Sequence, residues 1–450
     1  MDDSAPEHPR LRELAGWGRY PIIEGCEREG EELEALTPGA VLSRGLGRSY
    51  GDSSLPPSDK RPVVRTTRAD RLLAFDPQTG SLRAEAGLSL LELNRLFLSR
   101  GYFTPVTPGT QYVTLGGMVA ADVHGKNHHV AGCFGEHVEA LKLGLADGRV
   151  LEVREETEPE LFRATLGGMG LTGHILEVQF RMQRVPSPWI WAESERLPSL
   201  DRLIHGLRRA SSGWPFSVAW VDCLKRGRGM GRGIVHRGRW AEPDECPKRG
   251  PRPRRPRTLP MSFQSWALSS LTVRAFNALI LKKQGGKVRR GIVHPEAFFY
   301  PLDAVLNWNR ISGRRGFTQY QCVLPFSDDG SSYRSFFDLL TSLGGASFLC
   351  VIKDCGDEGR GLLSFPRPGI SIALDIPVRT GRTQDLIDAL NELTIELGGR
   401  IYLAKDAFTR AEHYQAMDPR LPAWQEVRRK WDPERSLRSA QSVRLFGDRP

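Results

Sequence analysis

Histidines, a lysine and many glycines are concentrated in the segment Thr107–Gly135, TPGTQYVTLGGMVAADVHGKNHHVAGCFG. Its apolar residues follow no 3.6-residue period, so the segment is not expected to form a regular amphipathic helix. Glycines let a backbone adopt positive φ and approach a ligand closely, and successive free N–H groups form anion-binding nests. One interpretation is a glycine-rich bed for a phosphate-bearing cofactor, with His124 and Lys126 facing the chemistry. The other is a β-meander of tight turns with buried, hydrogen-bonded histidines.

A second glycine-rich turn is LSRGLGRSYGDSS, residues 42–54. It is not a P-loop, because no Gly-Lys-Ser/Thr follows, and Tyr50-Gly51-Asp52 interrupts the GxGxxG pattern of dinucleotide-binding folds. The turn suits the wrapping of a pyrophosphate by backbone amides, with Arg44 and Arg48 as counter-charges.

The elements predicted around these two segments are short. The first 35 residues indicate a leading segment and a short helix, and residues 61–87 alternate short strands with turns. A helix is predicted over 88–101, where a glycine follows the last apolar repeat. Residues 138–153 predict two strands joined by an Ala-Asp-Gly hairpin turn, and a short helix follows at 160–165.

Two prolines in VPSPW, residues 185–189, indicate a domain boundary. Beyond it, runs of apolar and aromatic residues alternate with segments of helical spacing. This alternation predicts an α+β fold with an antiparallel sheet backed by helices, and mixed texture returns after Gly399. The strands are expected at 214–223, 317–326, 346–355 and 370–378, and the helices at 333–340 and 383–399.

The chain of 450 residues favours two or three domains. Its 40% hydrophobic and 26% charged residues are those of an ordinary globular protein. No apolar run is long enough for a transmembrane helix, and the acidic start MDDSAPEHPR does not resemble a secretory signal. The seven cysteines include no CxxC pair and no histidine at metal-ligand spacing, so free thiols in a reducing compartment and no metal site are expected.

Much of the formal net charge of +10 comes from PKRGPRPRRPR, residues 247–257. Its prolines and like charges prevent the segment from folding on its own. It is either a loop attracted to anionic lipid or nucleic acid, or a solvated surface insertion. Because no aromatic residues are interleaved with the basic ones, a nucleic-acid-binding module is not expected.

Eight motifs follow one another along the chain: RGLGRSYGD, TPGTQYVTLGG, DVHGKNHH, GGMGLTG, AWVD, FYPLD, QYQCVLP and YLAKD. Together they resemble the decaprenylphosphoryl-β-D-ribose 2′-oxidase family, flavoenzymes with the vanillyl-alcohol oxidase type of FAD-binding fold. HGKNHH together with YLAKD and QYQ is the specific part of the resemblance. It implies a PCMH-type FAD-binding domain in two pieces, 1–187 and 400–450, with an inserted antiparallel-sheet substrate domain, 188–399.

The resemblance also implies site residues. The first glycine-rich turn would wrap the FAD pyrophosphate and the central segment would line the flavin. The implied cofactor-binding residues are Ser43, Arg44, Gly45, Leu46, Gly47, Arg48, Ser49, Tyr50, Gly51, Asp52, Ser53, Gly109, Thr114, Leu115, Gly116, Gly117, Ala121, Asp122, Val123, His124, Ile175 and Tyr402. The implied substrate-pocket residues are Tyr50, Lys126, Trp220, Tyr300, Gln321, Lys353, Ser371 and Lys405, of which Tyr50 and Trp220 would pack the pocket wall or the core.

Oxidation of a secondary alcohol by a flavin needs a proton acceptor, orientation and the exclusion of water. Lys405 is the first catalytic candidate, as a buried lysine with a lowered pKa that takes a proton, or as a fixed cation near the flavin. The non-catalytic alternative for Lys405 is an ion pair with Asp406. His124 is the second candidate, as a base or as an orienter of the sugar hydroxyl. Its bland alternative is a turn histidine bonded to backbone.

The remaining polar pocket residues have supporting roles. Lys126 and Lys353 would hold the phosphate of the lipid-linked sugar as point charges, unless they are surface lysines. Gln321 and Tyr300 would hydrogen-bond the sugar ring.

Several positions depart from the family pattern. Ala373 stands where the family commonly has a cysteine, and Ser371 where it commonly has an asparagine. Because alanine lacks the nucleophilic thiol, we expect turnover without covalent capture by thiol-directed, nitroaromatic-derived inhibitors. Arg48 stands where many sugar-lactone oxidases attach FAD through a histidine, so non-covalent FAD is expected. The loop at 243–260 does not resemble the family consensus.

The leading hypothesis is an FAD-dependent oxidase acting at C2 of a polyprenyl-phosphoryl ribose. A separate NADH-dependent reductase would complete the 2′-epimerisation and give an arabinose donor for cell-wall polysaccharide. The alternative is an oxidase or dehydrogenase of another polyol, sugar or aldonolactone. A third hypothesis, a non-enzymatic basic protein with a dead flavin fold, is disfavoured by His124, Lys126, Gln321 and Lys405. The chain is expected to be cytoplasmic, with contact at a membrane surface for its lipid substrate.

Overall fold

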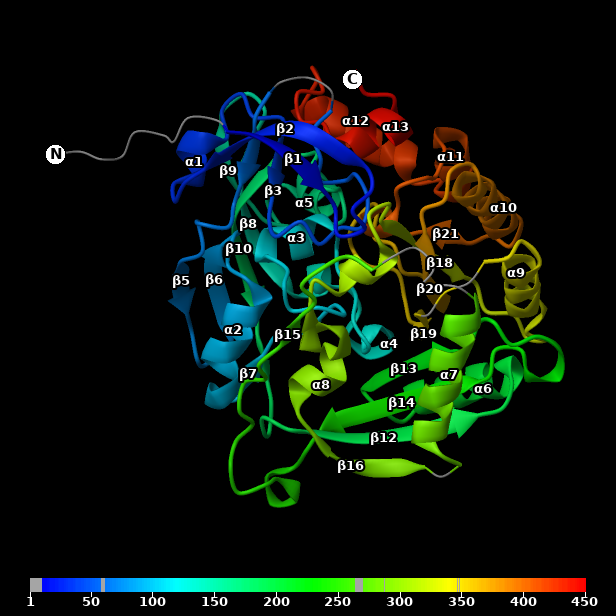
Figure 1. Cartoon of the computed structure of the whole chain (residues 1–450). Helices are drawn as coiled ribbons and strands as arrows, with labels where there is room; N and C mark the ends of the chain where they lie inside the picture. The colour runs from blue at the N-terminus through cyan, green and yellow to red at the C-terminus, as the bar shows by residue number, and fades with distance from the viewer. Residues whose placement is uncertain (1–9, 58–60, 264–269, 287, 346, 348) are drawn as a thin grey trace.

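The computed structural model describes residues 10–57, 61–263, 270–286, 288–345, 347 and 349–450 (Figure 1). Both ends of the chain contribute to one part of the molecule, and the middle of the chain builds the other. The C-terminal helices α12 (Leu421–Trp431) and α13 (Ala440–Phe446) lie beside the N-terminal strands β1 (Arg10–Ala15) and β2 (Ile22–Glu29) in Figure 1. The two chain ends are therefore built into one unit.

The N-terminal part contains two sheets. A four-stranded sheet has the order β1-β2-β4-β3, and an antiparallel five-stranded sheet has the order β5-β6-β10-β8-β9. The hairpin predicted over 138–153 is confirmed as the β8–β9 pair. The bounds are β3 (Leu42–Arg44), β4 (Val63–Arg65), β5 (Leu72–Phe75), β6 (Ser81–Glu85), β8 (Val138–Gly144), β9 (Val150–Val153) and β10 (His174–Arg181).

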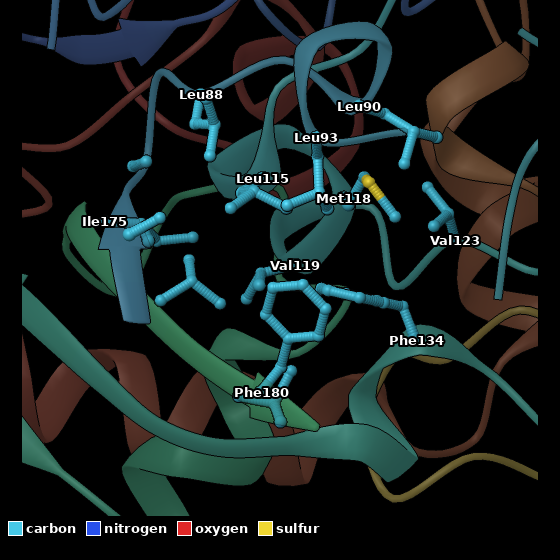
Figure 2. Close-up of a cluster of buried hydrophobic side chains, with 14 of the residues drawn as sticks. Leu88, Leu90, Leu93, Leu115, Met118, Val119, Val123, Phe134, Ile175 and Phe180 are labelled. Atoms are coloured by element: carbon cyan, nitrogen blue, oxygen red, sulfur yellow. The ribbon is translucent and has the colours of Figure 1, made fainter. Parts of the chain in front are cut away.

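Helices α2 (Leu90–Phe97), α3 (Leu115–Ala120) and α5 (Pro159–Thr165) belong to this part. The Ser89 hydroxyl accepts from Glu92 N to begin α2, and a 3-10 turn after the helix ends at Gly101, which has φ 79°. The predicted helix over 88–101 is thus confirmed, with a glycine at its left-handed end. Figure 2 shows Leu115 and Val119 of α3 among Phe134, Phe180 and Ile175 in one buried cluster. This core holds helix α3, and with it the central glycine-rich segment, in place.

Two expectations for the N-terminal part need correction. Residues 10–36 form the β1–β2 hairpin as well as the short helix α1 (Leu33–Leu36), and residues 1–9 lie outside the described residues. The hairpin was missed because its strands carry many charged residues and few buried ones. The central segment is also not turns alone, because it includes α3 and the short α4 (His128–Ala131).

The inserted part is built on an eight-stranded sheet of order β16-β12-β14-β13-β19-β20-β18-β21, in which every pairing is antiparallel. All four predicted strands of this region are present, although residues 346 and 348 of the third lie outside the described residues. The bounds are β12 (Ile190–Leu197), β13 (Phe216–Val221), β14 (Gly233–Trp240), β16 (Arg289–Val293), β18 (Phe317–Leu324), β19 (Cys350–Cys355), β20 (Gly369–Pro377) and β21 (Arg400–Ile401).

Helices α6 (Leu200–Ser211), α9 (Ser331–Ser342) and α10 (Arg382–Glu396) pack on one face of this sheet through a single apolar core. The two predicted helices of the region are confirmed as α9 and α10. Because β21 pairs with β18, the chain completes the inserted sheet just as it returns to the first part. The α+β class is therefore confirmed, while the three-segment domain division stays a prediction.

Two short two-stranded sheets complete the strand pairings of the described residues. Strand β7 (Tyr102–Phe103) pairs with β11 (Gln183–Arg184), and β15 (Arg257–Thr258) pairs in parallel with β17 (Val305–Leu306). The remaining helices are α7 (Ser270–Gln284), α8 (Pro295–Phe299) and α11 (Ala411–Met417). All seven cysteines are free. No helix in the described part of the chain combines the length and apolar character needed to cross a membrane.

Candidate active site

One face of the inserted sheet is polar where β18, β19 and β20 run side by side. Side chains alternate across a strand, so Gln319 and Gln321 of β18 lie on the face opposite the residues packed under α9 and α10. The register places Gln319 opposite Asp375 of β20, and Lys353 of β19 opposite Ser371 of β20. The sheet thus gathers buried amides, a hydroxyl, a carboxyl group and an amine.

His124 of the central segment meets this polar face. Its Nε2 lies 3.0 Å from Gln321 Nε2, and Gln321 Nε2 also donates to Ser371 Oγ at 3.1 Å. The imidazole centroid is 5.3 Å from the ring centroid of Phe365 and 5.1 Å from that of Tyr402. Three residues predicted to belong to one pocket, His124, Gln321 and Ser371, are therefore in one hydrogen-bonded row.

The imidazole of His124 is neutral at pH 7. Burial, followed by the Lys353 charge, lowers the pKa of His124 well below its usual value. Because an amide nitrogen donates, the contact from Gln321 makes Nε2 the acceptor and assigns the hydrogen to Nδ1. That Nδ1 is buried and has no partner among the described residues. A buried N–H without a protein acceptor suits the orientation of a ligand better than proton abstraction.

Asp122 holds the turn that carries His124. Asp122 adopts φ 37°, its Oδ1 accepts from Gly135 N at 2.7 Å, and its Oδ2 accepts from the Ser364 hydroxyl. An isolated bridge between His124 and Cys133 closes the turn. Burial raises the pKa of Asp122 to about 6. The Asp122 side chain therefore has a structural role, and only its backbone is left for a cofactor.

The other two histidines of the HGKNHH motif join the two parts of the molecule. His128 Nδ1 accepts from Gly356 N at 3.1 Å, and the His129 ring donates to Trp214 O at 2.9 Å. The central segment is therefore not the β-meander of the second interpretation, although two of its histidines, His128 and His129 of α4, are hydrogen-bonded to protein groups. The third, His124, lies in the His124–Gln321–Ser371 row, and its role toward a cofactor stays a prediction.

Lys405 approaches the same site from the C-terminal segment. It ends the 3-10 turn Leu403–Lys405, and Tyr50 N donates to Ala404 O at 2.9 Å within that turn. Lys405 Nζ lies 3.8 Å from the centroid of the Tyr50 ring. Burial lowers the pKa of Lys405 to about 7, against the opposing effect of the Asp375 charge. At neutral pH a large fraction of this amine is uncharged and able to take a proton.

The alternative ion pair between Lys405 and Asp406 is wrong. Asp406 Oδ2 lies 2.9 Å from the Arg444 guanidinium, which also binds Asp52 at 2.8 Å. The acidic group that faces Lys405 is Asp375, thirty positions earlier in the chain.

Asp375 is a site residue that sequence reasoning missed. Its Oδ1 accepts from Gln319 Nε2 at 2.6 Å, and its Oδ2 is buried with no partner among the described residues. Burial raises the pKa of Asp375 to about 7. The signal in the sequence was an aspartate inside the apolar run ISIALDIPV, a position where a carboxyl group needs a special reason to be buried.

Lys126 and Lys353 add two more half-buried amines. Lys126 Nζ donates to Phe299 O at 2.8 Å, and burial with the neighbouring Lys353 charge lowers the pKa of Lys126 to about 7. Burial also lowers the pKa of Lys353. The Lys353 charge acts through space on both Lys126 and His124. Amines gathered in this way would bind an anionic ligand well. The negative charge of that ligand would in turn favour the protonated form of the amines.

The turn between β3 and the Tyr50 position fits a pyrophosphate. Among the described residues, the backbone N–H groups of 45–49 have no acceptor, although these residues are largely half-buried. Arg48 lies over the Trp17 ring at 4.0 Å, and its Nε is buried without a described partner. Consecutive unpaired N–H groups beside an arginine form an anion nest. The residues present therefore fit the FAD that the resemblance implies.

Other members of the predicted pyrophosphate turn bind protein groups. Arg44 donates to Ser54 O at 3.0 Å and to Ala15 O at 2.7 Å, so its guanidinium supports the turn rather than acting as a free counter-charge. Ser43 Oγ lies 2.8 Å from His174 Nδ1. Gly51 packs so closely that an added Cβ would lie 1.8 Å from Asp406 O. The turn is thus fixed to the C-terminal segment before any ligand binds.

Some predicted residues lie outside the polar row. The Tyr300 hydroxyl is bonded to Asn94 at 2.9 Å and to Thr107, so it is already occupied. Trp220 lies on the same sheet face but packs against Ile234 and Leu281. The side chains of three predicted flavin contacts point into the apolar core, which leaves their backbone for a cofactor: Leu115, Val123 and Ile175.

Comparisons with known proteins identify the family of the chain. A family model described as an FAD binding domain matches residues 37–154. A decaprenylphosphoryl-β-D-ribose oxidase of Mycolicibacterium smegmatis is 34% identical over 98% of this chain and 99% of that protein. A putative D-arabinono-1,4-lactone oxidase of Neurospora crassa is 30% identical over 31% of this chain, and an L-gulonolactone oxidase of Mus musculus is 30% identical over 28%.

The FAD binding domain match, the α+β fold and the row of buried polar groups define an FAD-dependent oxidoreductase that acts on a CH–OH group. Its cofactor is FAD. Each of the two lactone oxidases matches less than a third of the chain, whereas the M. smegmatis relative matches nearly all of it. The chain belongs to the decaprenylphosphoryl-β-D-ribose oxidase family.

Proposed function

We propose that this protein oxidises the 2′-hydroxyl of a polyprenyl-phosphoryl-β-D-ribose to the 2′-keto compound. The observation that carries the proposal is the convergence of Lys405, with a pKa of about 7, and the His124–Gln321–Ser371 row on one polar sheet face. A secondary alcohol needs such a proton acceptor beside hydrogen-bonding groups that fix its orientation. The family relationship over the whole chain supports the substrate class.

Bound FAD supplies the hydride acceptor in this chemistry. Lys405 takes the hydroxyl proton in its neutral form, and the resulting ammonium remains beside the Tyr50 ring. Asp375 faces that ammonium and stabilises its charge. In its alternative role Lys405 is a permanent cation that favours the reduced cofactor. The amine must then be protonated, so activity would fall rather than rise as the pH increases.

The other polar groups orient and attract the sugar phosphate. His124 Nδ1 donates to a ribose oxygen while Gln321 fixes the imidazole. Lys126 and Lys353 provide positive charge for the phosphate, which is bonded to the carbon next to C2. Ala373 gives the pocket a small apolar wall opposite Gln321.

We further propose that FAD is held without a covalent bond. Arg48 stands in the turn where a histidine would be needed for attachment. Release of yellow colour into the supernatant after acid precipitation would support non-covalent binding, and colour retained in the pellet would contradict it.

The keto product must be reduced from the opposite face to give the arabinose configuration. We infer that an NADH-dependent reductase consumes it, and that the pair supplies an arabinose donor for cell-wall polysaccharide. A polyprenyl substrate also requires contact with a membrane surface.

The regiochemistry is tested with a polyprenyl-phosphoryl ribose that carries deuterium at C2. The proposal predicts that the product loses the deuterium and that turnover slows when hydride transfer limits the rate. Matched substrate labelled at C3 is the control and should keep its label. Loss of the C3 label, or oxidation of an aldonolactone in preference to both, would move the assignment to the alternative substrate class.

A further inference from the structure

An arginine-lined cavity lies between the two parts of the molecule, outside the His124–Gln321–Ser371 row. Its volume is about 320 Å³. Its lining includes Arg95 of α2 together with Arg254, Arg255 and Arg257 of the basic loop, residues 247–257. Asp303 and Glu296 are the carboxylates in the lining. Four arginines and two acidic residues thus line the cavity, so the net charge of its lining is positive.

The four arginines are not used by the protein itself. Within the described residues none of them has a carboxylate partner or a side-chain hydrogen bond. Asp303 is already occupied, because its oxygens accept from Gln111 N and the Thr110 hydroxyl, both at 2.8 Å. Guanidinium groups bind phosphate oxygens in pairs through their planar N–H forks. The unfilled donors of this cavity therefore match a phosphate group.

The basic loop is fixed against the scaffold. The His294 ring donates to Arg252 O at 2.7 Å, and Arg257 lies opposite Val305 in the short parallel ladder. Beyond the ladder, Phe263 N donates to Arg310 O at 3.0 Å. The arginines are consequently presented by an anchored strap, residues 252–263, which remains largely exposed to solvent.

The same strap exposes apolar side chains beside its arginines. Met261 is 69% exposed and Phe263 is 42% exposed, while Val305, 38% exposed, lines the cavity itself. Water-exposed apolar groups next to unpaired basic groups are the combination that binds an anionic lipid surface. A soluble phosphate compound would use the arginines but not Met261 and Phe263.

We propose that this cavity binds the phosphate of an anionic phospholipid headgroup and docks the protein on a membrane surface. The strap places Met261 and Phe263 against the acyl boundary while the arginines hold the phosphate. This binding needs no turnover, so it stands or falls separately from the proposed oxidation.

The test is co-sedimentation of the FAD-loaded protein with vesicles of phosphatidylcholine, with and without phosphatidylglycerol, at physiological salt. The cavity variant is Arg254→Gln/Arg255→Gln. Its matched control, Lys248→Gln/Arg249→Gln, removes the same charge from the same basic loop outside the cavity lining. A third variant, Arg95→Gln, removes a cavity arginine that belongs to another element. Flavin absorbance and the thermal midpoint report that each variant is folded.

The proposal predicts binding only to vesicles with phosphatidylglycerol. We expect the cavity variant to lose affinity about tenfold or more, Arg95→Gln about threefold or more, and the control less than twofold, since charge-assisted hydrogen bonds exceed diffuse attraction. Equal losses in the cavity variant and the control would overturn it in favour of general electrostatic attraction. Calorimetric binding of inorganic phosphate to the wild type, without vesicle binding, would overturn the lipid source and assign the cavity to a soluble phosphate compound.

Discussion

Lys405 is the residue on which the chemistry depends most directly. Lys405→Met keeps the side-chain length but removes the amine, so kcat should fall about 10²- to 10⁴-fold, the usual contribution of a general base. FAD content, read from the absorbance spectrum, should be unchanged. Undiminished turnover in a flavin-loaded Lys405→Met protein would exclude the assigned role.

The pH profile separates the two roles of Lys405. Its pKa is lowered from the ordinary lysine value to about 7. A base must be neutral, so kcat/KM should rise with pH through about 7. A cation must be charged, so activity should instead fall with pH through the same region. The direction of the limb therefore decides between proton acceptance and a fixed charge.

Asp375→Asn should shift the pH at which kcat/KM rises. The Asp375 charge raises the pKa of Lys405, so a neutral amide of the same size should lower it further. We expect the limb to shift to lower pH by about half a unit to one unit. The comparison Lys353→Met should move the limb in the opposite direction, because the Lys353 charge lowers the pKa of Lys405. Superimposable profiles for wild type and Asp375→Asn would mean that the two side chains are not coupled.

Ala373 determines the response to thiol-directed inhibitors. Ala373 is opposite Gln321 and is 9% exposed on the polar face. Intact-mass analysis should detect no inhibitor adduct on the wild type under turnover. Ala373→Cys should gain one adduct and otherwise keep its turnover, because only a thiol is added to the pocket wall. An inhibitor adduct that forms on the wild type without a thiol would contradict this prediction.

At the scale of elements, the C-terminal helix is linked to the pyrophosphate turn through Arg444. Its guanidinium binds Asp52 and Asp406 at 2.8 and 2.9 Å. Arg444→Met would leave two buried carboxylates unpaired, at a cost of about 3–5 kcal/mol in the free energy of unfolding. FAD affinity should fall as well, since the turn at 45–49 would loosen. Denaturant titration and flavin fluorescence measure the two effects.

Arg429→Met is the matched control on α12. Arg429 pairs with Glu426, and both side chains are more than two-thirds exposed. Loss of this exposed pair should cost at most about 1 kcal/mol. Equal destabilisation by the two substitutions would show that the Arg444 cluster does not hold the turn in place.

The sequence was informative where local signals determine structure. The β8–β9 hairpin and α2 follow from a turn tripeptide and a terminal glycine, and the strands of the inserted sheet from apolar runs. The β1–β2 hairpin was missed because it depends on pairing rather than on an apolar period. Asp375 was missed for a related reason. Its partners come from β18 and the C-terminal segment, and only the strand register brings them together.

At the scale of the whole molecule, FAD should stabilise the two-part fold by mass action. The pyrophosphate turn, the central segment and the C-terminal segment meet only in the folded chain. Ligand at one hundred times its dissociation constant adds about 2.7 kcal/mol to the free energy of unfolding. For one cooperative unit of this length the thermal midpoint should rise by about 3 °C. An identical midpoint with and without FAD would mean that the cofactor does not bind the folded protein.

The central claim is that the polar sheet face presents a lipid-linked ribose to bound FAD for oxidation. Its most direct test is the absorbance spectrum of the purified, FAD-loaded protein under anaerobic conditions, before and after addition of polyprenyl-phosphoryl ribose. The account predicts an oxidised flavin spectrum that bleaches on addition of this compound and not of the corresponding arabinose or a free aldonolactone. A flavin that stays oxidised with the ribose compound, but bleaches with another alcohol, would contradict the assigned substrate.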